Sequence, residues 1–115
     1  MSAFSRTNLL GELEQLVLLA VLQLGADAYP VTVRDEIQRR TGLDLARGSV
    51  YVALDRLDRK GYVESWFGDP TPERGGKAKR FFRVTPAGIR ALRQAEAAVA
   101  RMREGVRLRA AGRSR

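Results

Sequence analysis

The sequence predicts a mainly α-helical fold with a small β-hairpin wing, namely a winged helix-turn-helix followed by a C-terminal dimerisation helix. Three observations lead to this expectation. Two short helical segments are joined by a tight connection, two strand-like segments around a polar loop follow them directly, and the last helical segment repeats apolar residues at spacings of three and four. A chain of 115 residues has room for one compact domain.

The first helical segment, residues 9–24, is apolar on nearly all sides. One face repeats apolar residues at helical spacing, while Leu18, Leu19 and Leu22 place apolar surface on the other side. A helix of this kind needs burial on two sides. We therefore expect it to pack on its own domain and on a partner helix, and to end at Gly25.

The helix-turn-helix follows. Its first helix is expected from Pro30, a residue suited to a first helical position, to about Thr41, with Gly42 as the stop signal. The second, the recognition helix, is expected over about Arg47 to Lys60 and ends at Gly61. It is strongly amphipathic, with an inward stripe formed by Val50, Ala53, Leu54 and Leu57.

The wing is expected as two strands, Tyr62 to Phe67 and Arg80 to Val84, because both segments are rich in β-branched and aromatic residues. The intervening loop, 68–79, contains Pro and Gly residues that continue neither a strand nor a helix. Its aromatic neighbours are expected to pack the hairpin against the recognition helix, although such a cluster also suits a small effector.

The last helix is expected from Pro86, capped by Thr85, to about Leu108. Its apolar seam is Leu92, Ala95, Val99, Met102 and Val106, two heptads of a coiled coil, and we place these residues with Leu18 and Leu22 in a homodimer interface. The expected division is an N-terminal arm at 1–8, the winged helix-turn-helix domain at 9–85, the dimerisation helix at 86–108 and a basic tail at 109–115.

Charge and composition restrict the function. Lys and Arg number 21 against 13 Asp and Glu, a net charge of +8, which favours nucleic acid, an anionic membrane or an acidic protein as partner. The chain has no Cys and no His, which removes thiol and imidazole nucleophiles and most zinc sites. We expect no enzyme, catalytic residue, cofactor or metal. The apolar runs are too short for a membrane span, so a cytoplasmic protein with no membrane partner is expected.

The outward face of the recognition helix can enter a major groove. Ser49 and Arg56 can hydrogen-bond base edges, Val52 can touch a thymine methyl group, and Tyr51 can reach a phosphate. Asp55 either pairs with an arginine four residues further on or accepts a hydrogen bond from a cytosine amine. The alternative for the whole face is a solvated surface with ion pairs.

The wing strengthens the case for DNA. Between Thr71 and Arg83, five basic residues stand against one acid, Glu73, and two glycines allow close approach to a backbone. The alternative, a solubilising loop, does not require so many cations. The expected DNA-binding residues are Arg47, Ser49, Tyr51, Val52, Arg56, Arg59, Arg74, Gly75, Gly76, Lys77, Lys79 and Arg80.

Four segments resemble the short form of the PadR family of winged-helix regulators over about residues 9–95. They read LGELEQLVLLAVLQLG, YPVTVRDEIQRRTG, GSVYVALDRLDRKGYVES and PTPERGGKAKRFFRVTPAG. The resemblance implies a homodimeric transcription factor, usually a repressor, with double-stranded operator DNA as partner, first and last helices at the dimer interface, and Ser49, Tyr51 and the wing cations facing DNA. It also implies that a small-molecule effector is possible. One departure is Ala46, which stands where a capping Ser is frequent, so that cap falls to Asp44 or is weak.

Other classes of function remain open at this point. A protein-interaction module that has lost DNA binding is disfavoured by Arg56, Arg59 and the wing. RNA binding is possible because basic charge does not distinguish duplex types, yet no aromatic-rich sheet face is expected. A membrane-surface role for the C-terminal helix is disfavoured because its cations surround it rather than forming one face.

Overall fold

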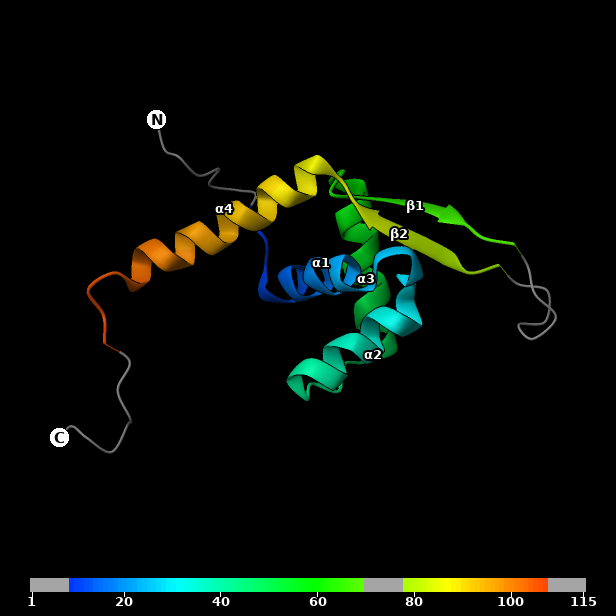
Figure 1. Cartoon of the computed structure of the whole chain (residues 1–115), viewed down its shortest axis with the longest axis horizontal. Coiled ribbons are helices and arrows are strands. Elements are labelled where there is room, and N and C mark those ends of the chain that lie inside the picture. Colours follow the sequence, from blue (N-terminus) through cyan, green and yellow to red (C-terminus); the bar gives the residue numbers. More distant parts are fainter. Residues whose placement is uncertain (1–8, 70–77, 108–115) are drawn as a thin grey trace.

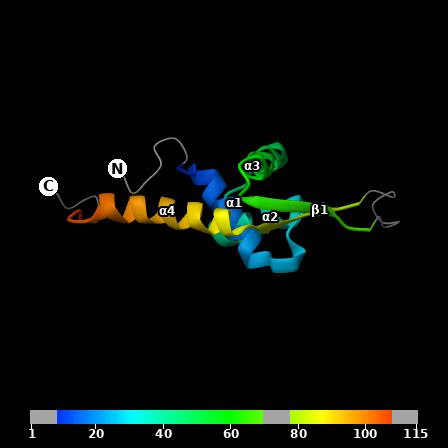
Figure 2. The same ribbon diagram turned by 90° about the horizontal axis from the view of Figure 1, so that it is seen from above.

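A computed structural model describes residues 9–69 and 78–107 of the chain. Its elements are, in order, α1 (Glu12–Leu24), the 3₁₀ helix η1 (Gly25–Asp27), α2 (Pro30–Thr41), α3 (Arg47–Arg59), β1 (Val63–Phe67), β2 (Arg80–Val84) and α4 (Pro86–Arg103). Helices α1, α2 and α3 form the body, and the hairpin and α4 extend from it in opposite directions (Figures 1 and 2). The predicted fold class, a mainly helical domain with one hairpin and a C-terminal helix, is confirmed.

The core lies where the three helices meet the base of the hairpin. Leu54, Leu57 and Val50 from α3 and Phe82 from β2 are almost completely buried there, and α1 contributes four apolar residues. The predicted inward stripe of α3 is therefore confirmed. Gly42 ends α2 with φ of 78°, a left-handed conformation that glycine adopts without steric cost.

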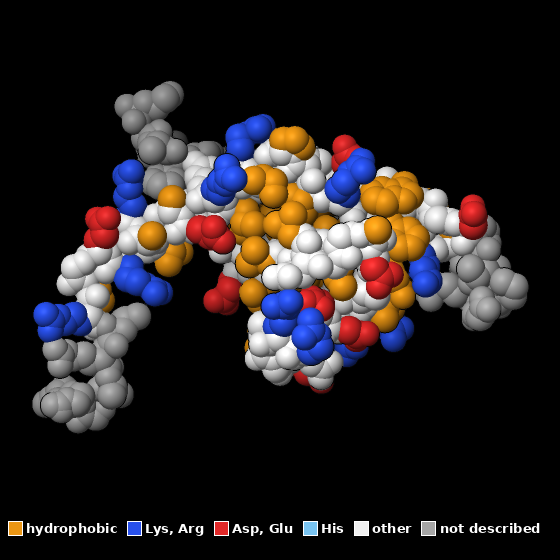
Figure 3. All heavy atoms as spheres, in the orientation of Figure 1, with side chains coloured by type: hydrophobic (Ala, Val, Ile, Leu, Met, Phe, Trp, Pro, Cys, Tyr) orange, Lys and Arg blue, Asp and Glu red, His pale blue; other side chains and the backbone are white. Residues whose placement is uncertain are grey.

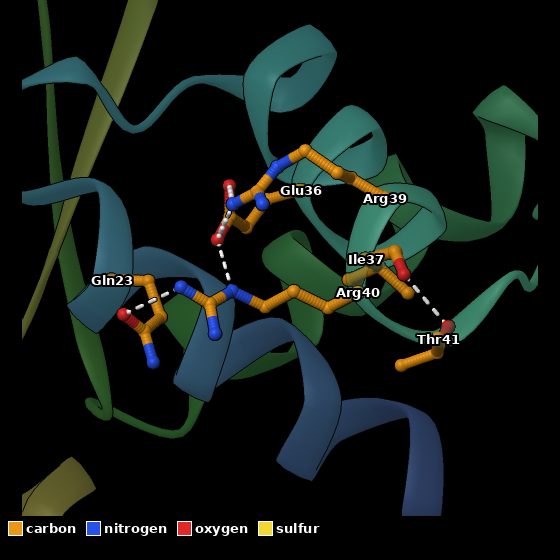
Figure 4. A network of polar contacts seen from close by, with 6 residues as sticks. All are labelled: Gln23, Glu36, Ile37, Arg39, Arg40 and Thr41. Carbon is orange, nitrogen blue, oxygen red and sulfur yellow. Dashed lines mark hydrogen bonds and ion pairs between the residues drawn. The ribbon is translucent and has the colours of Figure 1, made fainter.

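A polar network joins the end of α2 to α1 (Figure 4). Arg39 donates to both carboxylate oxygens of Glu36 at 2.8 Å, and Arg40 donates to Glu36 and, at 3.2 Å, to Gln23 on α1. The hydrogen bonds from Arg39 and Arg40 hold the pKa of Glu36 below its ordinary value. These contacts fix the first helix of the helix-turn-helix against α1.

The hairpin is antiparallel, with Val63 opposite Val84 and Phe67 opposite Arg80. It is tied to the body by a hydrogen bond of 2.9 Å from the Phe82 N–H to the Ala28 carbonyl. The strand bounds of β2 agree with the prediction, and β1 begins one residue later than predicted.

Helix α4 starts in a tight junction with the hairpin. The Thr85 hydroxyl accepts from the Gly88 N–H at 3.1 Å, which confirms the predicted cap. A Cβ atom at Gly88 would lie 2.2 Å from the Tyr62 carbonyl oxygen, so only glycine allows this approach. The direction in which α4 leaves the domain is therefore fixed at its first turn.

Three expectations about the dimer seam need correction. Leu18 is completely buried, because it belongs to the core that α1 forms with the other elements of its own chain. Leu92 and Ala95 are 5% and 3% exposed, since the first half of α4 packs on its own domain. The helix ends at Arg103 rather than near Leu108, because Gly105 adopts φ of 81° two residues later, and Val106 lies beyond the helix.

Candidate nucleic-acid interface

Helix α3 presents its outward face to solvent. Tyr51 and Val52 are 45% and 50% exposed, and Ser49 is also exposed. Ala46, at the start of the helix, supplies no side-chain cap. Asp44 does not replace it, because its carboxylate pairs with Arg34 at 3.2 Å.

Three arginines of this helix are exposed: Arg47, Arg56 and Arg59. Among the described residues, none of these three side chains makes a hydrogen bond or ion pair. Their guanidinium groups are available to an anionic partner. Of the two alternatives for Asp55, the pair with Arg59 is therefore not formed.

The end of α3 is anchored to the start of α1. Lys60 donates to Glu14 at 2.8 Å, and the other carboxylate oxygen accepts from the Gly11 N–H at 3.0 Å. Burial raises the pKa of Glu14, but these two hydrogen bonds and the charges of Lys60 and Arg56 outweigh it and hold the pKa below its ordinary value. The sequence did not single out this ion pair, because its partners are 46 residues apart.

Asp55 pairs with a residue of the hairpin. Arg80 donates through Nη1 to Asp55 at 3.0 Å, through Nη2 to Asp58 at 2.7 Å and through Nε to the Ser65 hydroxyl at 3.1 Å. Its guanidinium also lies 4.9 Å from the centre of the Phe82 ring. Arg80, which the sequence predicts as a DNA-binding wing cation, thus bridges the hairpin to α3.

The other described cations of the hairpin also have partners within the chain. Lys79 Nζ lies 4.5 Å from the centre of the Tyr29 ring, and Arg83 pairs with Glu64, its cross-strand neighbour, at 2.5 Å. The remaining wing residues predicted to bind DNA lie outside the described residues: Arg74, Gly75, Gly76 and Lys77.

Two hollows bring the predicted residues together. One, of about 410 Å³ between α1 and α3, is lined by Ser49, Val52 and Arg56. The other, of about 200 Å³, lies between the start of α2, α3 and the loop end of the hairpin. It joins Tyr51 of the recognition helix to Lys79 and Arg80 of the wing.

Sequence reasoning missed several residues of these hollows. Leu13 and Glu14 of α1 line the first, and Tyr29, Val31 and Phe67 line the second. Phe67, the last residue of β1, is 69% exposed. The sequence does not show this exposure, because an aromatic residue at the end of a strand can be either buried or exposed.

The aromatic cluster of the hairpin agrees with the expectation in part. Phe82 is buried in one core with apolar residues of α3, and Tyr62 packs against that core. The Trp66 and Phe81 rings stack at 6.1 Å, and Phe81 meets Tyr29 edge to face at 5.6 Å, so these rings pack toward the segment before α2. Trp66 also lines a mainly apolar cavity of about 330 Å³ against the end of α1.

Metal binding and membrane insertion are two further possibilities for residues 9–69 and 78–107. No group of three or more acidic, His or Cys side chains there could hold a metal ion. No single helix in these ranges is long and apolar enough to cross a membrane, although α1 with η1 and α2 reach that length as a pair bent by 120°.

Comparison with known proteins identifies the family. The model of the transcriptional regulator PadR-like family matches residues 18–94. An uncharacterized protein of Lysinibacillus sphaericus is 30% identical over 80 residues, which are 68% of this chain and 69% of that protein.

Solved structures agree with this assignment. A PadR family transcriptional regulator from Eggerthella lenta is 28% identical, with a TM-score of 0.64 over 83% of this chain and 82% of that one. A transcriptional regulator from Clostridium thermocellum shares the fold, with 22% identity and a TM-score of 0.67 over 78% of this chain and 84% of that one. The chain belongs to the PadR-like family of transcriptional regulators, whose members act through DNA and are not enzymes.

Proposed function

We propose that this protein is a sequence-specific regulator of double-stranded operator DNA that acts as a homodimeric repressor in the cytoplasm. The observation that carries this proposal is the outward face of α3. It exposes Arg47, Arg56 and Arg59 without partners among the described residues, beside a hydroxyl and an apolar side chain at Ser49 and Val52. Arginine, serine and valine at one face supply donors for base edges and a contact for thymine methyl groups.

In this proposal, the recognition helix reads bases and the wing holds the backbone. Tyr51 lines the same hollow as Lys79, at the loop end of the hairpin, which supports contact of both residues with the same stretch of phosphates. The glycines and cations of residues 74–77 extend this contact from the wing. The proposed division of the chain keeps an arm at 1–8, the DNA-binding domain at 9–85, the C-terminal segment at 86–108 and a basic tail at 109–115.

The experiment that tests DNA recognition is footprinting on the DNA upstream of the protein's own gene. We expect two protected half-sites related by symmetry, about one helical turn apart. Protection that is uniform along the fragment at every concentration would contradict sequence-specific binding. Repression is tested separately, by transcription of the same fragment with and without the protein.

The dimer interface is proposed on α1 and the free half of α4. Val99 and Met102 are 53% and 79% exposed on α4, and Leu19 and Leu22 are 38% and 44% exposed on α1. Apolar side chains gather over α1, between α4 and the hairpin (Figure 3). A second copy that covers these residues removes them from water, which is the main favourable term in association.

Replacing Val99 with Asp tests this interface. Two carboxylates would be buried against each other across the symmetry axis, so light scattering should show monomers or aggregates. Ala97→Asp is the matched control, because residue 97 is exposed on nearly the opposite side of α4 and its variant should remain a dimer. An unchanged dimer for Val99→Asp would show that the seam is elsewhere.

A small-molecule effector is proposed for the cavity beside Trp66. Val21, Leu22 and Val84 supply an apolar lining, and Arg83 lies at the same cavity. Trp66 is the single tryptophan of the chain, so its fluorescence reports occupancy directly. A compound that releases the DNA without changing this fluorescence would place the effector elsewhere.

A further inference from the structure

Arg80 is positioned to act on the recognition helix rather than on DNA. It is the first residue of β2, and it uses three nitrogen atoms on three partners: Asp55 and Asp58 of α3 and Ser65 of β1. The Phe82 ring lies against its guanidinium. The Arg80 side chain is 30% exposed, less than either aspartate that it binds.

The two aspartates do not occupy equivalent places. Asp55 lies on the face of α3 that is turned away from the core. On a helix of 3.6 residues per turn, its side chain leaves the axis in a direction about 20° from that of Gly48 and between those of Tyr51 and Arg59. Its side chain is 49% exposed. Asp58 lies on the flank next to the hairpin and is 35% exposed.

A carboxylate at the position of Asp55 is unfavourable for DNA binding. The charged residues of Arg47–Arg59 are three arginines and two aspartates, so the acids offset most of the positive charge of the helix. A free carboxylate facing a groove repels the phosphates that line it, and like charges brought together at an interface are costly. Unless Asp55 accepts a hydrogen bond from a cytosine amine, its charge must be neutralised if α3 enters the groove.

We infer that Arg80 shields Asp55 from DNA and holds the hairpin at a fixed angle to α3, and is thereby a positioning residue for DNA binding. The forked guanidinium suits both tasks, because one planar group can bind two carboxylates while a lysine would act as a single point charge. This inference rests on the proposed function of the α3 face. It assigns Arg80 no contact with DNA.

The test is a double-mutant cycle between Arg80 and Asp55. Fluorescence anisotropy of a labelled random-sequence duplex at low salt measures binding by the full chain and its variants. Arg80→Met should weaken binding about tenfold when Asp55 is present. In the Asp55→Asn background the same change should cost less than about twofold, because no carboxylate remains to be exposed.

The matched control is Asp58→Asn, which changes the net charge equally at the flank of the helix. In that background Arg80→Met should still cost about tenfold. An equal rescue by both asparagines would show an effect of total charge and overturn the shielding role. A loss in every background, with a salt slope lowered by about 1 per subunit, would show that Arg80 itself neutralises a phosphate.

Thermal unfolding of the same variants separates positioning from folding. Arg80→Met and the Arg80→Met/Asp55→Asn double variant both lack the Asp55–Arg80 bridge. Shielding therefore predicts that the double variant binds DNA better than Arg80→Met but does not melt at a higher temperature. Arg80→Gln is the second variant, because its amide can still donate to Asp58, and it should show the same dependence on Asp55.

If the unaltered protein binds no duplex, the proposed DNA-binding function fails and this inference with it. If it binds but the cycle is additive, only the role of Arg80 is wrong.

Discussion

The arginines of α3 and those of β2 carry the same charge but differ in whether they have an ion-pair partner. Arg47, Arg56 and Arg59 on α3 have no ion-pair partner among the described residues. On β2, Arg80 binds two aspartates and Arg83 binds Glu64. The first group is available to an external anion, whereas the second holds the hairpin to itself and to the helix.

This difference shows that the number of cations in a segment does not measure its capacity for DNA. An ion-paired arginine must lose its partner, or share it, before it can neutralise a phosphate. The described arginines of β2 therefore hold the hairpin together and hold it to α3. The direct contribution of the wing to DNA binding is expected from its lysines, Lys77 and Lys79.

The largest expected effect follows from removing a free arginine of α3. Arg56→Ala should cost roughly 1–3 kcal/mol on the operator, chiefly through lost discrimination at one base in each half-site. Titrations against operator and scrambled duplexes measure this difference. If both duplexes lose affinity equally, Arg56 contacts the backbone instead of a base.

A smaller and less specific effect is expected from the wing loop. Lys77→Ala should weaken operator and random DNA alike, and should lower the salt slope by about 1 per subunit, because one phosphate contact is lost. Titrations at two salt concentrations give the slope. A loss confined to the operator would indicate that the wing reads sequence, for example through the width of the minor groove.

Local signals in the sequence predicted most of the fold, because the residues that end and begin its elements act on their immediate neighbours. Pro30, Gly42 and the Thr85 cap with its following proline gave element bounds that the structure confirms. The pattern of apolar residues predicts a last helix that is too long, because the pattern continues to Val106, past the stop at Gly105. Leu18 was misplaced because the periodicity of α1 does not show which of two apolar sides faces its own core.

The site was predicted less completely, since its electrostatics depend on pairs far apart in the chain. Arg80 and its two aspartates are separated by 25 and 22 residues, and the fold alone brings them together. A helical spacing rule could only offer Arg59 as a partner for Asp55. The exposure of Ser49, Val52 and Arg56, by contrast, follows from the amphipathic pattern of α3 and agrees with the structure.

Lys60, directly after α3, is a cation that pairs within the chain, with Glu14 of α1. The effect of this pair is expected on the stability of the fold. Glu14→Gln should lower the free energy of unfolding by about 1 kcal/mol at neutral pH, since the exposed Lys60 limits the strength of the pair. The pKa of Glu14 is lowered in the folded protein, so its stabilisation is complete above the unfolded value of about 4.3 and is lost as the pH falls through the folded pKa.

Urea unfolding of both proteins at neutral pH and at successively lower pH measures this loss. The difference between them should shrink as Glu14 becomes protonated. A difference that stays constant down to acid pH would mean that Glu14 acts through packing or through neutral hydrogen bonds instead of its charge. Glu12→Gln is the matched control, because Glu12 is exposed in the same turn and should show little effect at any pH.

The smallest effect is expected for Arg83, although its side chain is 67% exposed. Successive residues of a strand point to opposite faces, so Arg83 lies on the face of β2 opposite to Arg80 and away from α3. Arg83→Ala should therefore leave operator binding and the salt slope unchanged within about twofold, because the pair that it breaks is a surface ion pair of small value. The same titrations used for Arg56→Ala provide the measurement, with Glu64→Gln as the variant that frees Arg83 without removing it. If Arg83→Ala weakens binding as much as Arg56→Ala, the hairpin contacts DNA through this face. Free and ion-paired arginines would then contribute equally to DNA binding, which contradicts the difference drawn above.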